Sequence, residues 1–399
     1  ATWLAQTEDS ERVSRIQLAP LDRDAITRLI DTELPMAADA RDAVVQHLGE
    51  VTGGNPFFLR RVLMDWWDHG LLHMNAATRC WQPDLAGLQA LPLPDDVVDL
   101  VLEQLRRQPT TVQDSLRHLA GLDNAATTEE LAALLGIEAD ELHRQLEIAN
   151  RYQLIHWSDG QPRFWHDRIQ EAAYTLTPEQ DRPDFHHHLA RFLHRQDAEH
   201  HRVMAQYLRA LARIDTATER SAVFNLALQT AEAANAEFAH DVALQTYQAA
   251  EVLRPSDHWA QDPEQALSFE LALIRCEFRS GSEQAARDRI RALEQRNLDV
   301  VERAMLDQLL IERLIAEDDQ HGALDYALVT LDRLGVSIPR DDDALVQRVA
   351  SQRQRIAEQT MATDLEAAPL LDDPKAAIAL SVMTGAAGAA YVMRPQLWQ

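Results

Sequence analysis

Residues 155–174 read IHWSDGQPRFWHDRIQEAAY, which is two short β runs followed by an amphipathic helix. The β runs meet at Asp159-Gly160, a pair that favours a tight hairpin turn. Three helical patterns precede the hairpin, around residues 112–119, 127–136 and 138–154. Three helices followed by a β-hairpin predict a winged helix, which we place at residues 109–178.

The pair His166-Asp167 lies where the second β run ends and the next helix begins. Asp167 is placed to cap that helix, with Gln170 at the position that completes a capping-box-like arrangement. His166 is then either a packed residue at the strand end or a side chain held where it reaches a phosphate group. The sequence pattern alone leaves both interpretations open.

Residues 1–108 form a separate helical region around the stretch TGGNPFFLRRVLMDWWDHG at 52–70. Asn55 is placed to cap a helix that has Pro56 at its first position, where the missing N–H costs nothing. Asp22 is placed to cap an earlier helix that runs to about Leu34. The other elements predicted here are a short strand at IQLAPL (16–21), a helix at 38–51, a hairpin of LLHM (71–74) with RCWQPD (79–84), and a helix that starts near 94.

Residues 179–399 are helical throughout and contain three similar stretches. These are HDVALQTYQAAEVLRP (240–255), SEQAARDRIRALEQ (282–295) and HGALDYALVTLDRLG (321–335), which recur about every forty residues, as helical-hairpin repeats do. The first matches the tetratricopeptide spacing of small, aromatic and proline positions best, through Ala231, Ala243, Tyr247, Ala250 and Pro255. The whole chain is therefore predicted to be mainly α, with a helical region at 1–108, a winged helix carrying a small β-hairpin, and a tetratricopeptide-like solenoid.

The composition argues against a nucleic-acid partner, because the 399 residues carry a formal net charge of -26. Acidic side chains also dominate the stretch at 127–151 that supplies the second and third helices of the winged helix, and a helix that faces phosphates is not acidic. The two cysteines, Cys80 and Cys276, lie far apart and form no disulfide framework, so we expect a reducing cytosol.

The sequence contains no phosphate-binding loop, which requires Gly-Lys followed by Ser or Thr. Its single lysine, Lys375, follows Pro374. We therefore expect no ATP hydrolysis by residues 1–399 alone, and we assign no catalytic residue. The opening ATWLAQTEDSERVSRIQLAPL reads as the middle of a longer chain, and we expect an excised piece of a larger protein.

Two further stretches invite functional interpretations that the residues do not favour. His186, His187 and His188 are consecutive, so they point in different directions on a helix and are expected to be packing or surface residues with no metal bound. Residues 377–393 carry no charge, yet they are short for a membrane span and rich in small side chains. We expect a helix packed among other helices, and no membrane span.

Two runs in this sequence resemble a known family. The runs are GGNPFFLRRVL (53–63) and the complete pattern Phe-x-His-Asp-Arg-x-Gln-x-Ala-Ala-Tyr from Phe164 to Tyr174, and the repeats end a hairpin with LDRLGVSIP (331–339). Together they resemble the signal-transduction ATPases with numerous domains. More narrowly, they resemble the ATPase segment of large bacterial proteins that join a serine/threonine-kinase-like domain, an ATPase, a sensory domain and a sensor histidine kinase.

The resemblance implies roles for particular residues. In that family a Gly-x-Pro of the lid packs on the adenine of ATP or ADP, which implies Gly54, Asn55 and Pro56 here. The family's winged-helix histidine contacts the β-phosphate of ADP in the resting state, which implies His166. The Walker A and Walker B strands of that family, together with their Mg²⁺ site, are missing from this sequence, and IQLAPL looks like the last piece of the nucleotide-binding core.

The resemblance implies a regulatory segment of a cytoplasmic signalling ATPase and protein kinase. In this interpretation a protein or small-molecule signal binds the repeats, and the winged helix and lid pass that signal to a nucleotide-binding core of the same molecule. Two alternatives stay open: the same module in a transcriptional regulator with a separate DNA-binding domain, or a protein-binding scaffold with no dependence on nucleotide.

Overall fold

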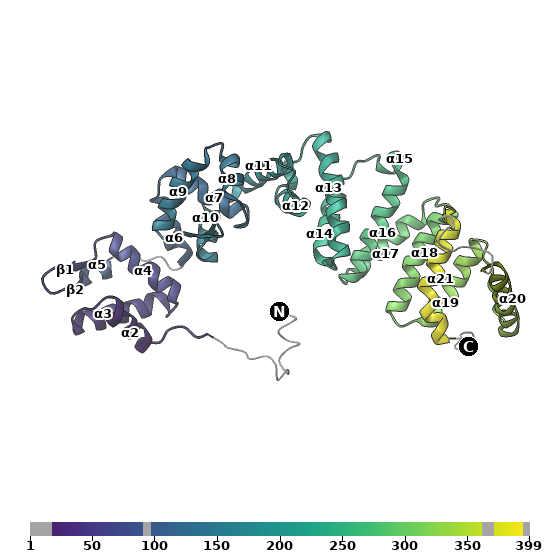
Figure 1. Cartoon of the computed structure of the whole chain (residues 1–399), viewed down its shortest axis with the longest axis horizontal. Helices are drawn as coiled ribbons and strands as arrows, with labels where there is room; N and C mark the ends of the chain where they lie inside the picture. The colour runs from purple at the N-terminus through teal and green to yellow at the C-terminus, as the bar shows by residue number, and fades with distance from the viewer. Residues whose placement is uncertain (1–17, 91–96, 361–370, 394–399) are drawn as a thin grey trace. The chain divides into compact units, whose positions relative to one another are not determined.

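The computed structural model describes residues 18–90, 97–360 and 371–393. In these residues the chain is mainly α, with two small two-stranded antiparallel sheets, as predicted (Figure 1). The chain divides into two compact units, Ala1–Gln196 and Asp197–Gln399. The predicted ranges 1–108, 109–178 and 179–399 subdivide the chain differently and stay predictions.

The first part of unit 1 begins with α2 (Arg23–Glu33), α3 (Ala38–Thr52) and α4 (Pro56–Asp68). Asp22 caps α2 as predicted, because its Oδ1 accepts a hydrogen bond from the N–H of Ala25 at 2.8 Å. The predicted hairpin is present as β1 (Leu72–Asn75) and β2 (Cys80–Pro83), and α5 (Leu85–Ala90) follows it. Residues 18–21 of IQLAPL form no strand, and 16–17 lie outside the described residues.

The second part of unit 1 has the order predicted for a winged helix. The winged region, residues 109–178, contains α7 (Thr110–Gly121), α8 (Thr128–Leu135), α9 (Ala139–Arg151), β3 (Ile155–Ser158), β4 (Gln161–Phe164) and α10 (Asp167–Thr175). Helix α6 (Val97–Arg106) precedes it, within the range 1–108 predicted for the first region. The hairpin turns at Asp159 and Gly160, which both have positive φ, at 51° and 76°. Helix α10 packs against α6 as well as α7, so α6 covers the helix that follows the wing.

Helix α11 (Arg182–Arg195) closes unit 1 and packs on the helices of the winged region. Gly121 allows close contact, because a Cβ at this position would lie 2.5 Å from Cε1 of Phe185. The hydroxyl of Tyr174 lies 2.7 Å from Nε2 of His186, which is buried. His186, His187 and His188 are buried, half-buried and exposed in turn, so the three side chains point in different directions as predicted.

The described residues of unit 2 form helices, and six of these helices pair in three hairpins. The helices are α12 (His200–Leu208), α13 (Ala217–Ala236), α14 (His240–Leu253), α15 (His258–Gln261), α16 (Pro263–Arg279), α17 (Glu283–Glu294), α18 (Val300–Ala316), α19 (Gln320–Arg333), α20 (Asp342–Thr360) and α21 (Pro374–Met393). The hairpins are α13 with α14, α16 with α17 and α18 with α19 (Figure 1). The small and aromatic positions of the first repeat, Ala231, Ala243, Tyr247 and Ala250, are buried, as the repeat pattern requires.

A fully buried carboxylate joins α18 and α19. Asp307 accepts hydrogen bonds from Arg303 at 3.0 Å and Arg333 at 2.9 Å, and from the hydroxyls of Tyr326 at 3.2 Å and Thr330 at 3.1 Å. Its side chain is 0% exposed. A carboxylate in such a position is tolerated because two guanidinium groups and two hydroxyls replace its water shell.

Helix α21 packs on α18 and α19 through small side chains, which agrees with the packing predicted for 377–393. Ala379, Val382, Ala386 and Ala389 share a cluster with Ile311, Ala323 and Ala327. By length and composition alone, α21 is the one helix among the described residues that is apolar enough to cross a membrane. A helix packed in a protein core passes the same test, so this finding is weak evidence for a span.

Candidate functional site

The stretch Gly54-Asn55-Pro56 forms the turn into α4. Asn55 caps the helix as predicted, since its Oδ1 accepts from the N–H groups of Phe57 at 3.0 Å and Phe58 at 3.1 Å. Pro56 occupies the first helical position. The turn therefore presents a proline ring and an ordered backbone at the start of a helix.

Gly54 is held against the segment that precedes α2. Its carbonyl accepts a hydrogen bond from the N–H of Leu21 at 2.8 Å, and its φ is +77°. A Cβ at Gly54 would lie 2.2 Å from the carbonyl oxygen of Leu21, so only glycine fits without movement of the main chain. Gly54 thus shapes the turn, and the main chain of Leu21 occupies the space where a side chain at position 54 would lie.

The cap of α10 is His166, and the predicted cap, Asp167, is the first residue of the helix. His166 has extended backbone, with φ -158° and ψ 147°, and its Nδ1 accepts from the N–H of Arg168 at 3.1 Å. The prediction was wrong because histidine is not among the usual capping residues, whereas aspartate is. The residue-type preference thus pointed to Asp167, whereas the residue between the strand and the helix, and hence the cap, is His166.

This capping bond determines which ring nitrogen of neutral His166 carries the proton. Since Nδ1 accepts a hydrogen bond, the proton of the neutral ring lies on Nε2. The residue is exposed, and Nε2 has no hydrogen-bond partner among the described residues. His166 therefore offers a donor N–H to solvent from the start of a helix, which is the arrangement that suits an anionic oxygen.

Phe57 brings the two sequence motifs together. Its ring stacks on the imidazole of His166, with centroids 4.2 Å apart and planes 15° apart. Sequence reasoning missed this residue as a site component, because a Phe-Phe pair at the start of a helix reads as core. The stacking places the His166 side chain of the winged region directly beside the Asn55-Pro56 turn, one residue from Pro56.

Arg61 also joins α4 to the winged region. It is 3% exposed, and its guanidinium donates to the carbonyls of Tyr152 at 3.1 Å and Gln153 at 2.6 Å, at the end of α9. The side chain of Gln104 accepts a third, longer bond of 3.4 Å. Burial, together with the nearby charge of Arg60, lowers the pKa of Arg61 to about 10. Within the described residues no carboxylate pairs with this guanidinium, so its charge is balanced by carbonyl dipoles.

A second link between α4 and α6 lies one turn further along. Asp65 is buried and forms an ion pair with Arg107 at 3.1 Å, and its Oδ2 lies 3.3 Å from Nδ1 of His69. Helix α4 therefore has two polar links to later elements: Arg61 contacts the end of α9, and Asp65 contacts Arg107, which follows α6. The orientation of α4 is thus coupled to the orientation of the winged helix.

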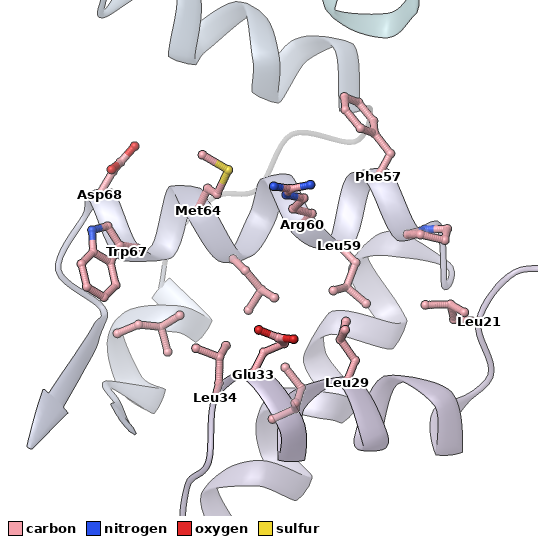
Figure 2. A pocket seen from close by; sticks show the side chains of 14 residues that line it. Leu21, Leu29, Glu33, Leu34, Phe57, Leu59, Arg60, Met64, Trp67 and Asp68 are labelled. Carbon is pink, nitrogen blue, oxygen red and sulfur yellow. The ribbon is translucent and has the colours of Figure 1, made fainter. Parts of the chain in front are cut away.

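A cavity of about 850 Å³ lies between α2 and α4. Figure 2 shows Leu29 of α2 and Leu59 of α4 pointing toward one another across it, with Leu21 at the end near the start of α4. Pro56 and Phe57 belong to its lining, whereas Gly54, Asn55 and His166 do not. The lining is mostly aliphatic and aromatic, with charged groups from Glu33, Arg60 and Asp68.

The predicted site residues are therefore only partly brought together. His166 stacks on Phe57, which follows Pro56 in the chain, Asn55 supports this turn as a helix cap, and Gly54 faces Leu21. Within the described part of the chain, no group of three or more His, Cys, Asp or Glu side chains is arranged to hold a metal ion.

No family model matches this chain, and no curated protein matches it. A solved structure that matches is the signal transduction ATPase with numerous domains from Pyrococcus horikoshii, which carries a tetratricopeptide repeat sensor. The two are 12% identical, with a TM-score of 0.33. The match covers 96% of this chain and 56% of the other, so this chain spans little more than half the length of that protein.

Proposed function

We propose that residues 1–399 are the regulatory segment of a cytoplasmic signalling ATPase of the kind with numerous domains. The helical repeats of unit 2 bind a signal. Unit 1 contacts a nucleotide through the start of α4 and the start of α10, in partnership with a nucleotide-binding core in the same larger protein. The output is control of a kinase domain.

The stacking of Phe57 on His166 is the observation that supports this proposal most. Two motifs that lie more than a hundred positions apart in the sequence supply adjacent residues. One motif offers an apolar surface through Pro56 and Phe57, and the other offers an N–H donor at a helix start. An apolar surface beside an anion donor is the pairing that a nucleotide requires.

The residues present fit ADP in their chemistry. His166 supplies a donor for a phosphate oxygen through Nε2, and Pro56 supplies an apolar surface for the base. The nucleotide, when bound, supplies charged oxygen atoms that accept hydrogen bonds. Gly54 and Asn55 hold the turn in shape, Gly54 through Leu21 and Asn55 through its cap.

Arg61 gives the proposal a route for a signal. The carbonyls of Tyr152 and Gln153 follow α9 of the winged region, and Arg61 follows Phe57 and Arg60 on α4. Movement of the winged helix would therefore move α4 and the Pro56-Phe57 surface. A nucleotide biases such an arrangement only if it binds the two positions with different affinity.

The test measures ADP dissociation from the larger protein that contains the nucleotide-binding core. His166→Asn is the informative variant, because an asparagine side chain still caps α10 but lacks a donor at the position of Nε2. Loss of one hydrogen bond to a charged group predicts a dissociation rate about tenfold faster or more. His143→Ala is the control, since His143 is another exposed histidine in a ring contact, beside Trp157, outside the proposed site.

An unchanged ADP dissociation rate in His166→Asn, with the melting temperature of the nucleotide-free protein also unchanged, would refute the contact. The melting temperature matters because His166 also caps a helix. A variant that loses stability without nucleotide has lost the cap, and a variant that loses only ADP retention has lost the phosphate contact.

A further inference from the structure

Unit 2 contains a small polar pocket between consecutive helical hairpins. Its volume is about 310 Å³, and it is formed by α13, α14 and α16. The side chains that argue for a ligand are Asn225, Gln229 and Glu232 of α13, Tyr247 of α14, and Gln265 and Ser268 of α16. The volume lies at the lower end of the range for ligand sites, so it suits a small molecule or one side chain.

Tyr247 is the α14 side chain that lines this pocket. The residue is 2% exposed, yet its hydroxyl has no hydrogen-bond partner among the described residues, and the residue belongs to the lining. The oxygen is not sealed from solvent, so a ligand in the pocket replaces water as its hydrogen-bond partner. Its ring packs edge-on against Phe269, with centroids 6.0 Å apart, so the hydroxyl is held in place rather than free to turn away.

The electrostatics of the pocket favour a positive charge. Glu232 is the one charged side chain in the lining, and it forms no ion pair within the described part of the chain. Burial and the charge of Glu232 raise the pKa of Tyr247, so the hydroxyl keeps its proton at neutral pH. Arg275, whose charge acts on Tyr247, already pairs with Glu312 at 3.2 Å, and Arg279 on the same helix donates to Asn235 at 3.2 Å.

The remaining polar groups suit a ligand that donates hydrogen bonds. Amide or hydroxyl oxygens come from Asn225, Gln229 and Ser268, and the Oε1 of Gln265 already lies 3.0 Å from Nε2 of His258. Leu228, Phe269 and Ala272 add an apolar wall. A short apolar chain that ends in several N–H donors matches both parts of the lining.

We infer that this pocket binds a small organic cation, an ammonium or guanidinium group on a short apolar chain. Glu232 balances the charge and Tyr247 accepts one hydrogen bond. The inference deepens the signal-binding role proposed above for unit 2, and it rests on that role only for its biological meaning. The binding itself is measured without nucleotide, so its failure leaves the His166 contact untouched.

The experiment compares three probes of matched size by calorimetry and by chemical-shift changes: butylammonium, the neutral butyramide and the anion butyrate. Agmatine tests a guanidinium in place of an ammonium group. A short peptide with one lysine tests whether the cation comes from a protein side chain, and butylammonium tests whether it comes from a free small molecule. Salt on the order of 0.3 M screens the general attraction of an acidic chain for any cation. We expect saturable binding of the cations, weaker binding of butyramide and none of butyrate.

Two variants decide whether the pocket is responsible. Glu232→Gln is expected to weaken cation binding about tenfold or more, while Glu237→Gln, at the end of the same helix and outside the lining, leaves it unchanged. Tyr247→Phe is expected to weaken binding without lowering the melting temperature, because the hydroxyl makes no bond in the described chain. Equal effects of Glu232→Gln and Glu237→Gln, preference for butyrate, or no saturable binding at millimolar cation would overturn the inference.

Discussion

Replacement of Asp307 by asparagine is expected to destabilise unit 2 strongly, although the two side chains have nearly the same shape. Oδ1 of Asp307 accepts from Arg303 and Tyr326, and Oδ2 accepts from Arg333 and Thr330. An asparagine has one NH₂ group in place of an oxygen. In either orientation of the amide, that donor faces a guanidinium donor.

The magnitude follows from these contacts. The variant loses the charge of a fully buried carboxylate and at least one charge-assisted hydrogen bond. Removing one member of a buried ion pair costs about 3–5 kcal/mol. The side chains of Arg303 and Arg333 are 29% and 49% exposed, so water recovers part of that cost. We therefore expect a loss of about 3 kcal/mol, at the lower end of that range.

Urea unfolding followed by circular dichroism measures this change, and Asp325→Asn is the matched control. Asp325 lies on α19 as well, but its side chain is 60% exposed and its contact with His321 is 4.0 Å long. Surface substitutions of this kind change stability by about 0.5 kcal/mol or less. A value for Asp307→Asn within the range of the control would refute the reasoning from buried charge.

Two more predictions concern unit 1. Gly54→Ala is expected to lower the free energy of unfolding in urea by about 2 kcal/mol or more, because it adds a clash with Leu21 to the strain of positive φ. Gly70 also has positive φ but has open space around it, so Gly70→Ala should show only the strain of about 1 kcal/mol. Equal losses of stability in the two variants would contradict the clash. Burial lowers the pKa of His118, so the folded state resists its protonation and stability is lost as pH falls below about 6.5. The difference in unfolding free energy between wild type and His118→Gln should shrink from pH 7.5 to pH 5, and parallel pH profiles would rule this out.

Most elements of the fold were predictable from local patterns. Asp22, Asn55 and Pro56 mark helix starts by residue type, and Asp159-Gly160 marks the hairpin. The solenoid followed from the recurrence of small and aromatic positions. These signals lie within a few residues of the structure that they specify, so a single sequence shows them.

The contacts that build the candidate site were less predictable, because they join residues far apart in the sequence. Phe57 reaches His166, and Leu21 fills the space at Gly54. Nothing in the sequence pattern around Arg61 indicates that its guanidinium donates hydrogen bonds to two backbone carbonyls. The cap of α10 was misassigned for a different reason, since the choice between His166 and Asp167 depends on where the strand ends.

The buried guanidinium of Arg61 also limits how this protein can be recombined. If residues 18–90 were transplanted to another protein without α9, Arg61 would lose the two carbonyls that accept its hydrogen bonds. The carbonyls of Tyr152 and Gln153 would lose their donor in the remainder. Residues 18–90 and the winged region are thus expected to keep their structure best when they are moved together. The natural cut is the division after Gln196, where unit 1 ends.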